Sequence, residues 1–422
     1  MAEETALHGA WRARATKALA GGVSSNVRML NPHVIADRAE GARMWDVDGR
    51  EYIDYVLGQG PNFLGNAPRQ ILEKVEAAQR RGVIYAATHR TEIEAAEKVI
   101  EVLGWPDRVR FGSSSSEMVQ AALRMARHAT GRSRVLRFHG QYHGWFDNIH
   151  IRSDGDTALP AGGGQLPQAL DEVVTVQWND RSAFDEALAA YGDELAAVIM
   201  EPVMLNSGAI EPGPGYLRAV RDACTANGTV LVFDETITGF RLAVGGAAER
   251  YGVYPDLAVY GKAMAGGWPC AAVVGRGELF EGIATGAVVH AGTFNGNVPA
   301  TAATLACLEH IADGEVHRRT ERVGGQLMSS LAALSAEHGL GLVLQGPPMA
   351  FHARFADPPT PATRYQDVQN ADSARYLRFS RALVGHGVWV ASRGIWYVSA
   401  AHTEQDVALT VDRVAGAVHA LH

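Results

Sequence analysis

The middle of the chain alternates short apolar runs with longer segments in which apolar residues recur every three or four positions. Continuous apolar runs are typical of parallel strands covered on both faces, and the intervening segments are typical of helices that pack on them. The pattern therefore predicts an α/β domain with a mostly parallel, seven-stranded sheet. The predicted strands are Arg108–Phe111, Arg134–Phe138, Val173–Val176, Ala196–Met200, Val230–Phe233, Leu257–Tyr260 and Ala271–Val274.

The N-terminal residues follow another pattern. Residues 1–20 predict a polar helix, and residues 23–30 predict a polar loop. Strands are expected at His33–Ala36 and Arg43–Asp46, with a hairpin turn at Asp48-Gly49, because Asp-Gly between apolar runs is a strong hairpin signal.

Beyond the sheet domain the pattern becomes α+β, with short strands and amphipathic helices. We expect the N-terminal strands to pack with this C-terminal part in a discontinuous small domain. The expected division is an N-terminal segment of the small domain at 1–60, a large α/β domain at 61–309, and a C-terminal segment at 310–422.

Charge and cysteine content argue against several classes of partner and site. The net charge of −8 gives no reason to expect nucleic acid or an anionic membrane as a partner. The three cysteines, Cys224, Cys270 and Cys307, form no metal pattern, and their odd number argues against a disulfide framework. No signal peptide or membrane-spanning run is evident, so we expect a cytoplasmic protein without a metal site.

The stretch Val230–Trp268 carries the strongest chemical signal. Two apolar runs end in ionisable residues, the first in Asp234 and Glu235 and the second in Gly261-Lys262. Ligands of open α/β sheets bind outside the carboxyl ends of the strands. An aspartate and a lysine placed there suit a pyridine cofactor, because the lysine can form a Schiff base with an aldehyde while the carboxylate keeps the ring nitrogen protonated. A strand-end salt bridge is the alternative.

Other predicted strand ends carry weaker signals. Gly112 to Glu117 could bind phosphate through serine hydroxyls and free helix N–H groups, or could be a plain N-cap. Tyr142 could stack on a flat cofactor or lie in the core. Glu201 and Asn206 could bind a ring hydroxyl or make ordinary loop hydrogen bonds, and the glycine-rich loop Gly292–Asn297 could bind phosphate or be a turn.

Together these residues resemble the class III aminotransferases, which are fold-type I pyridoxal-phosphate (PLP) enzymes, and among them the glutamate-1-semialdehyde aminomutase branch. The resemblance covers nearly the whole chain. The segments that carry it are Gly21-Gly22-Val23, Val27-Arg28, Trp45 to Gly49, Tyr52 to Tyr55, Gly140 to Gly144, Glu201 to Val203, Phe233 to Arg241, Gly261-Lys262, Gly292 to Asn297 and Ala401 to Glu404.

The resemblance implies a role for each candidate residue. Lys262 forms the Schiff base and shuttles a proton, Asp234 pairs with the pyridine nitrogen, and Tyr142 lies over the ring. The remaining implied cofactor contacts are Glu201 and Asn206 near the phenolic oxygen, Ser114, Ser115 and Ser116 at the phosphate, and Thr293 at the phosphate of the neighbouring subunit of a homodimer. Arg28 is a candidate for a substrate carboxylate, and the loops around Ser24, Gln59, Trp145 and Arg393 are expected to shape the substrate pocket.

Three departures from the family pattern bear on function. Ser115 replaces a glycine of the usual phosphate loop, which requires a backbone shape that tolerates a β-carbon. Gln59 stands where aminomutases usually carry tryptophan, and the segment Ala391–Trp396 lacks their gating glutamate. Arg393 in that segment is either a pocket contact or a surface arginine.

The departures favour an aminotransferase that moves an amino group between an amino acid or carboxylate-bearing amine and a keto or aldehyde acceptor by ping-pong kinetics. An aminomutase or amino-acid epimerase, which needs no external acceptor, is the first alternative. A catalytically silent PLP-binding scaffold is the second.

Overall fold

The structure is a computed structural model that describes residues 5–419. Contacts divide the chain into two compact units. Unit 1 contains Met1–Pro68, Arg318–Pro361 and Asn370–His422, and unit 2 contains Arg69–His317 and Ala362–Gln369. Within the described residues, none of the helices combines the length and apolar character that crossing a membrane requires.

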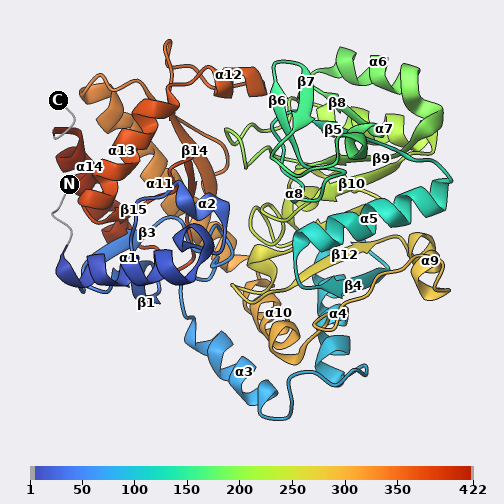
Figure 1. Cartoon of the computed structure of the whole chain (residues 1–422), viewed down its shortest axis with the longest axis horizontal. Coiled ribbons are helices and arrows are strands. Elements are labelled where there is room, and N and C mark those ends of the chain that lie inside the picture. Colours follow the sequence, from blue (N-terminus) through green and yellow to red (C-terminus); the bar gives the residue numbers. More distant parts are fainter. Residues whose placement is uncertain (1–4, 420–422) are drawn as a thin grey trace. The chain divides into compact units, whose positions relative to one another are not determined.

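Unit 2 is organised around a seven-stranded sheet with the order β4-β12-β11-β10-β9-β5-β8 (Figure 1). The predicted mostly parallel α/β sheet is confirmed, and β12 is the strand that runs antiparallel to its neighbours. The strands are β4 (Arg108–Gly112), β5 (Arg134–Phe138), β8 (Val173–Val176), β9 (Leu195–Met200), β10 (Val230–Asp234), β11 (Leu257–Tyr260) and β12 (Ala271–Gly275).

Helices and a hairpin complete unit 2. The helix α5 (Ser115–Thr130) packs its buried face on the central strands and forms the core beneath them with β9, β10 and β11. The other elements are α3 (Arg69–Gln79), α4 (Arg90–Leu103), β6 (Ile151–Asp154), β7 (Thr157–Pro160), α6 (Arg181–Tyr191), α7 (Tyr216–Asn227), α8 (Gly246–Tyr251), α9 (Glu281–Ala284), α10 (Val298–Ile311) and α12 (Tyr365–Gln369).

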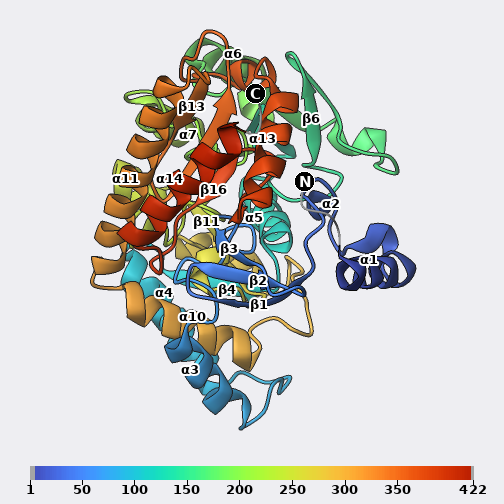
Figure 2. The same ribbon diagram turned by 90° about the vertical axis from the view of Figure 1, so that its left-hand side faces the viewer.

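Unit 1 combines segments from both ends of the chain. A four-stranded sheet has the order β1-β2-β3-β15, and a three-stranded sheet has the order β13-β14-β16. Helices α13 and α14 lie beside these sheets in both views (Figures 1 and 2). The elements are α1 (Ala6–Ala18), α2 (Asn26–Met29), β1 (Ala36–Glu40), β2 (Arg43–Asp46), β3 (Glu51–Asp54), α11 (Glu315–Glu337, which crosses the unit boundary), β13 (Leu342–Gln345), β14 (Ala350–Phe355), α13 (Ser373–Gly385), β15 (Val388–Trp389), β16 (Ile395–Tyr397) and α14 (Glu404–His419).

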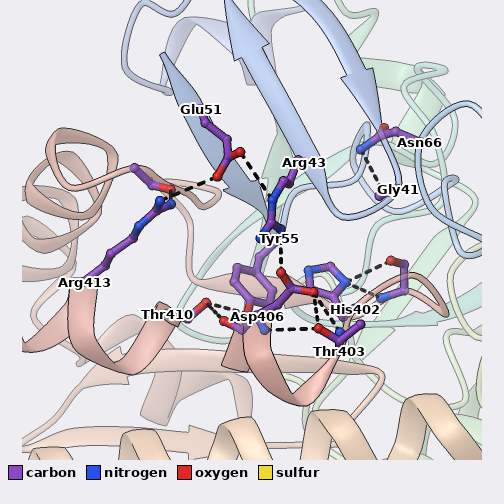
Figure 3. A network of polar contacts seen from close by, with 12 residues as sticks. Gly41, Arg43, Glu51, Tyr55, Asn66, His402, Thr403, Asp406, Thr410 and Arg413 are labelled. Carbon is purple, nitrogen blue, oxygen red and sulfur yellow. Dashed lines mark hydrogen bonds and ion pairs between the residues drawn. The ribbon is translucent and has the colours of Figure 1, made fainter. Parts of the chain in front are cut away.

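Polar contacts tie the N-terminal hairpin to α14 within unit 1 (Figure 3). Arg43 Nη1 lies 2.5 Å from Asp406 Oδ1, and the Tyr55 hydroxyl lies 2.8 Å from that of Thr410. Asp406 is largely buried, and its pKa is lowered because hydrogen bonds from Arg43 and Thr403 outweigh the effect of burial, which alone would raise it. Sequence segments more than 350 residues apart are thus joined by one largely buried ion pair and a hydroxyl contact.

Several local predictions were wrong. The strand expected at His33–Ala36 begins only at Ala36, and residues 23–30, expected as a loop, contain the short helix α2. The hairpin β6–β7 and the long helix α11 were not predicted. The helix expected over residues 1–20 is found as α1, and residues 1–4 lie outside the described residues.

Candidate active site

Strand register brings the predicted site residues of unit 2 to one edge of the sheet. Phe233 pairs with Met200, so Asp234 and Glu201 follow at the same level. Asp234 pairs with Val259 of β11, and Lys262 lies three residues beyond. On the other side of β11, Tyr260 pairs with Ala272 of β12. The next residue of the β12 pairing, Ala271, pairs with Gly112 at the end of β4. The serine-rich loop that follows β4 therefore lies at this same edge.

Asp234 is held by two hydrogen bonds in a buried position. Its Oδ2 lies 2.9 Å from His143 Nδ1, and its Oδ1 accepts the Thr236 N–H at 3.1 Å. Burial lowers the pKa of His143, and the bond to Asp234 opposes this effect. A neutral imidazole facing a carboxylate donates from Nδ1. Each Asp234 oxygen retains a lone pair that could accept a further N–H.

Lys262 follows β11 in an unusual backbone conformation. Its φ of 43° lies in the left-handed region, which is costly for a residue with a side chain and is concentrated at functional sites. The preceding Gly261 lies so close to α5 that a β-carbon there would be 2.4 Å from Ser115 Oγ. The lysine backbone is therefore fixed directly beside the first turn of α5.

The serine-rich loop has two kinds of member. Ser114 is the N-cap of α5 and forms a capping box with Glu117, so the plain N-cap reading applies to this residue. Ser115 and Ser116 lie in the first helical turn, where backbone N–H groups have no intrahelical acceptor. The helical backbone of Ser115 accommodates a β-carbon, so the replacement of glycine at this position causes no distortion.

Glu201 organises the loops beside Asp234. It accepts hydrogen bonds from the backbone N–H of Tyr142 (2.8 Å) and from the backbone and side-chain nitrogens of Asn206 (3.2 and 3.1 Å). Burial raises the pKa of Glu201 to about 7, against these hydrogen bonds, which lower it. Tyr142 is 43% exposed and is not a core residue; its ring meets that of His150 edge-on.

Gly144 joins the Tyr142 loop to the phosphate-loop candidate. Its φ is +95°, and a β-carbon there would lie 2.7 Å from Ser116 Oγ and 2.9 Å from Ser116 Cα. The loop after β5, the start of α5 and the residue before Lys262 thus approach one another closely through two glycines.

The remaining candidates belong to other segments of the chain. Thr293 is exposed in a turn before α10, and Arg28 and Ser24 are exposed in unit 1. Gln59 and Arg393 meet in unit 1, where Arg393 Nη2 donates to Gln59 Oε1 at 3.3 Å beside Asn31 and Ala391. Arg393 is half-buried in this contact, so it is not a simple surface arginine.

Sequence reasoning missed three residues near Asp234. His143 lies in the segment Gly140 to Gly144 that carries the family resemblance, but no sequence pattern gives it a role. Gln141 exchanges two hydrogen bonds with the Glu201 backbone (2.8 and 3.1 Å), and Arg137 is a fully buried cation on β5. A charged residue between Leu136 and Phe138, inside a predicted strand, was the one signal that could have singled out Arg137.

Comparison with known proteins decides the family. The sequence model described as aminotransferase class-III matches residues 24–394. The chain belongs to the class-III aminotransferase family. It is 37% identical to a glutamate-1-semialdehyde 2,1-aminomutase from Methanothermobacter thermautotrophicus over 404 residues, which cover 94% of this chain and 96% of that protein.

Solved structures agree with this class-III assignment. An omega-transaminase from Sphaerobacter thermophilus superposes with a TM-score of 0.92 at 30% identity, covering 99% of this chain and 98% of that one. The PLP internal aldimine form of the FumI protein from Sphingopyxis sp. MTA144 superposes with a TM-score of 0.88 at 27% identity, covering 98% and 96%. The protein is thus a fold-type I, PLP-dependent enzyme.

The residues of unit 2 fit this cofactor. Asp234 offers a buried acceptor at the end of β10, and Lys262 offers an amine at the end of the adjacent strand. Gly144 and Gly261 let the loop after β5 and the backbone before Lys262 approach Ser115 and Ser116 closely, next to the N–H groups at the start of a 16-residue helix.

Proposed function

We propose that this class-III enzyme is an aminotransferase that moves an amino group from an amino acid or carboxylate-bearing amine to a separate keto or aldehyde acceptor. The observation that carries the proposal is the contact between Gln59 and Arg393. In this cluster, which also includes Val27, Leu30, Asn31 and Ala391, polar side chains and a cation stand in place of the acid expected for an aminomutase. The omega-transaminase neighbour supports intermolecular transfer.

Arg393 is proposed to bind the substrate carboxylate, with Gln59 holding the guanidinium. Gln59 accepts through Oε1, so its amide N–H₂ remains a donor. Asn31 likewise uses its Oδ1 to accept the Ser392 N–H at 3.2 Å, which leaves its amide N–H₂ as a donor. A guanidinium flanked by amide donors selects an anion, and arginine binds carboxylates in a bidentate geometry. Ser24 and Arg28 remain further candidates.

In the proposed mechanism, PLP when bound withdraws electron density from the carbon that carries the amine. Asp234 would accept a hydrogen bond from the ring nitrogen of the cofactor, and His143 Nδ1–H would orient this carboxylate. Lys262 Nζ takes and returns the substrate proton. Glu201 fixes Tyr142 and Asn206 through its hydrogen bonds. Ser115 and Ser116 would donate to the phosphate of the cofactor.

An aminomutase is the second candidate, because the 37% identity to a glutamate-1-semialdehyde aminomutase favours it. The two functions differ in their need for an acceptor. We expect the holoenzyme, given a carboxylate-bearing amine alone, to release one equivalent of keto product per site and then to stop. Addition of a keto acid should restart turnover.

Continued isomerisation without any acceptor would identify an aminomutase or epimerase instead. Absence of product and of any spectral change across a panel of amines would identify a silent scaffold. We also propose the homodimer that the resemblance implies, with Thr293 reaching the partner's phosphate. Sedimentation equilibrium tests the dimer, and a monomer that retains full activity would remove Thr293 from the site.

A further inference from the structure

Arg137 is a buried cation next to the proposed site. Its side chain is 1% exposed, and it donates from Nη1 to the Ile149 carbonyl and from Nη2 to the carbonyls of Gln141 and Phe138. Within the described residues, the hydrogen-bond partners of Arg137 are backbone carbonyls and not carboxylates. A buried charge without a direct counter-ion is costly, so its retention calls for an explanation.

Strand geometry places Arg137 on the same sheet face as the two buried carboxylates. Side chains alternate between faces along a strand, so residues two positions apart lie on the same face. Val135, Ile199 and Val232 belong to the core beneath α5. Arg137, Glu201 and Asp234 each stand two residues later on the same strands and therefore share that face.

The register then sets the distance along the strands. Val135 pairs with Ala197, so Arg137 is level with Ile199, which pairs with Val232. Arg137 therefore lies one row before Glu201 and Asp234 on the same face, within reach of a long side chain.

The contacts of Arg137 also hold the loop that follows β5. The carbonyls of Phe138 and Gln141 belong to the segment that carries Tyr142 and His143. Gln141 in turn bonds to the backbone of Glu201 on the neighbouring strand. The cation and the loop geometry are therefore connected through backbone groups.

We propose that Arg137 is a positioning residue whose fixed positive charge, on the sheet face that carries Asp234 and Glu201, favours the neutral form of His143. This inference rests on the proposed roles of Asp234 and His143. The groups that interact with this charge are the carboxylates of Glu201 and Asp234 and the imidazoles of His139, His143 and His150. The two carboxylates stabilise the cation, and the cation lowers the pKa of each imidazole, where burial is the larger cause.

The test compares Arg137→Lys, which keeps the charge, with Arg137→Met, which removes it at similar length. The direct readout is the titration of His143, followed by NMR in cofactor-free protein. In Arg137→Met we expect this titration to move to higher pH, the pH profile of the holoenzyme to shift, and turnover at neutral pH to fall roughly tenfold. Arg137→Lys should retain the wild-type titration.

Arg132→Met is the matched control, because Arg132 also donates to backbone carbonyls, those of Leu195 and Asn227, but at the opposite end of β9. It should reduce stability without moving the titration. If Arg137→Met does not fold, Arg137→Gln, which keeps one amide donor, replaces it.

The proposal would be overturned if the His143 titration did not move and turnover fell equally in both Arg137 variants. That result would mean that Arg137 only anchors the loop after β5. A moved titration in a protein that transfers no amine would leave this inference standing while the proposed function fails.

Discussion

His143 Nδ1 lies 2.9 Å from Asp234 Oδ2, and both side chains are buried at the carboxyl edge of the seven-stranded sheet. The pair joins the loop after β5 to the end of β10, two strands that are not adjacent in the sheet. It fixes the carboxylate that we propose for the cofactor nitrogen.

Replacement of Asp234 by asparagine should remove the charge and keep the shape. We expect kcat to fall by roughly 10³-fold, because the electrostatic partner of the ring nitrogen is lost. Steady-state kinetics with a competent amine measure this. The control is Glu235→Gln at the adjacent buried carboxylate, which accepts from Ala247 and Ala248 at the start of α8 and should mainly affect stability. Equal losses of kcat in both variants would contradict the assignment.

Replacement of Gly144 by alanine should weaken PLP binding. The added β-carbon meets Ser116 at 2.7 Å in a backbone with φ of +95°, so the first turn of α5 must shift. We expect the Kd for PLP to rise roughly tenfold, which corresponds to a loss of about 1.4 kcal/mol. Gly131 at the end of the same helix has φ of +67°, and a β-carbon added there would have no neighbour within 4 Å. Gly131→Ala should therefore cost stability and leave PLP affinity unchanged.

Removal of Arg43 should destabilise unit 1. Asp406 is largely buried, so Arg43→Met leaves its charge without its main partner (Figure 3). Since the arginine is itself partly exposed, we expect a loss of roughly 1–3 kcal/mol in the free energy of unfolding. Arg322 and Glu404 form an exposed pair at the start of the same helix α14, and Arg322→Met should cost less than about 1 kcal/mol. Urea unfolding compares the two, and similar losses would contradict the importance of the Arg43 pair.

Acid should destabilise unit 1 through His352. Burial lowers its pKa to about 3, and the bond between its Nε2 and the Arg393 carbonyl opposes this only in part. Below an unfolded pKa of about 6.5 the unfolded chain binds a proton that the folded chain does not, so stability falls as the pH falls. The contribution is about 1.4 kcal/mol per pH unit between about 6.5 and the folded pKa. His352→Gln should flatten the pH dependence of unfolding by that amount, and an unchanged slope would refute the assignment.

Sequence patterns predicted the elements that depend on local periodicity. Ile71, Val75 and Ala78 recur at helical spacing in the sequence and form the buried face of α3, and all seven predicted central strands are found. Helix α11 was missed because Gly324-Gly325 is a loop signal in sequence. In the structure Gly324 is required by close packing, since a β-carbon there would lie 2.2 Å from the Pro348 carbonyl oxygen.

The candidate site was predictable only where chemistry follows a strand directly. Asp234, Glu201 and Lys262 each stand at or just after the end of a predicted strand, so residue type and position make them candidates. His143 and Arg137 depend on the placement of β5 beside β9 and of β9 beside β10. That order is not the order of the sequence, and no local pattern encodes it.

The central claim is that Lys262 is the residue to which PLP is bound. The chain contains only four lysines, Lys17, Lys74, Lys98 and Lys262, and two of the others form ion pairs, Lys74 with Glu309 and Lys98 with Glu101. Reduction of the holoenzyme with borohydride followed by peptide mass spectrometry locates the attached cofactor. We predict one modified peptide, carrying the label on Lys262. A label on another lysine, or an unlabelled Lys262 in protein that contains PLP, would contradict the account.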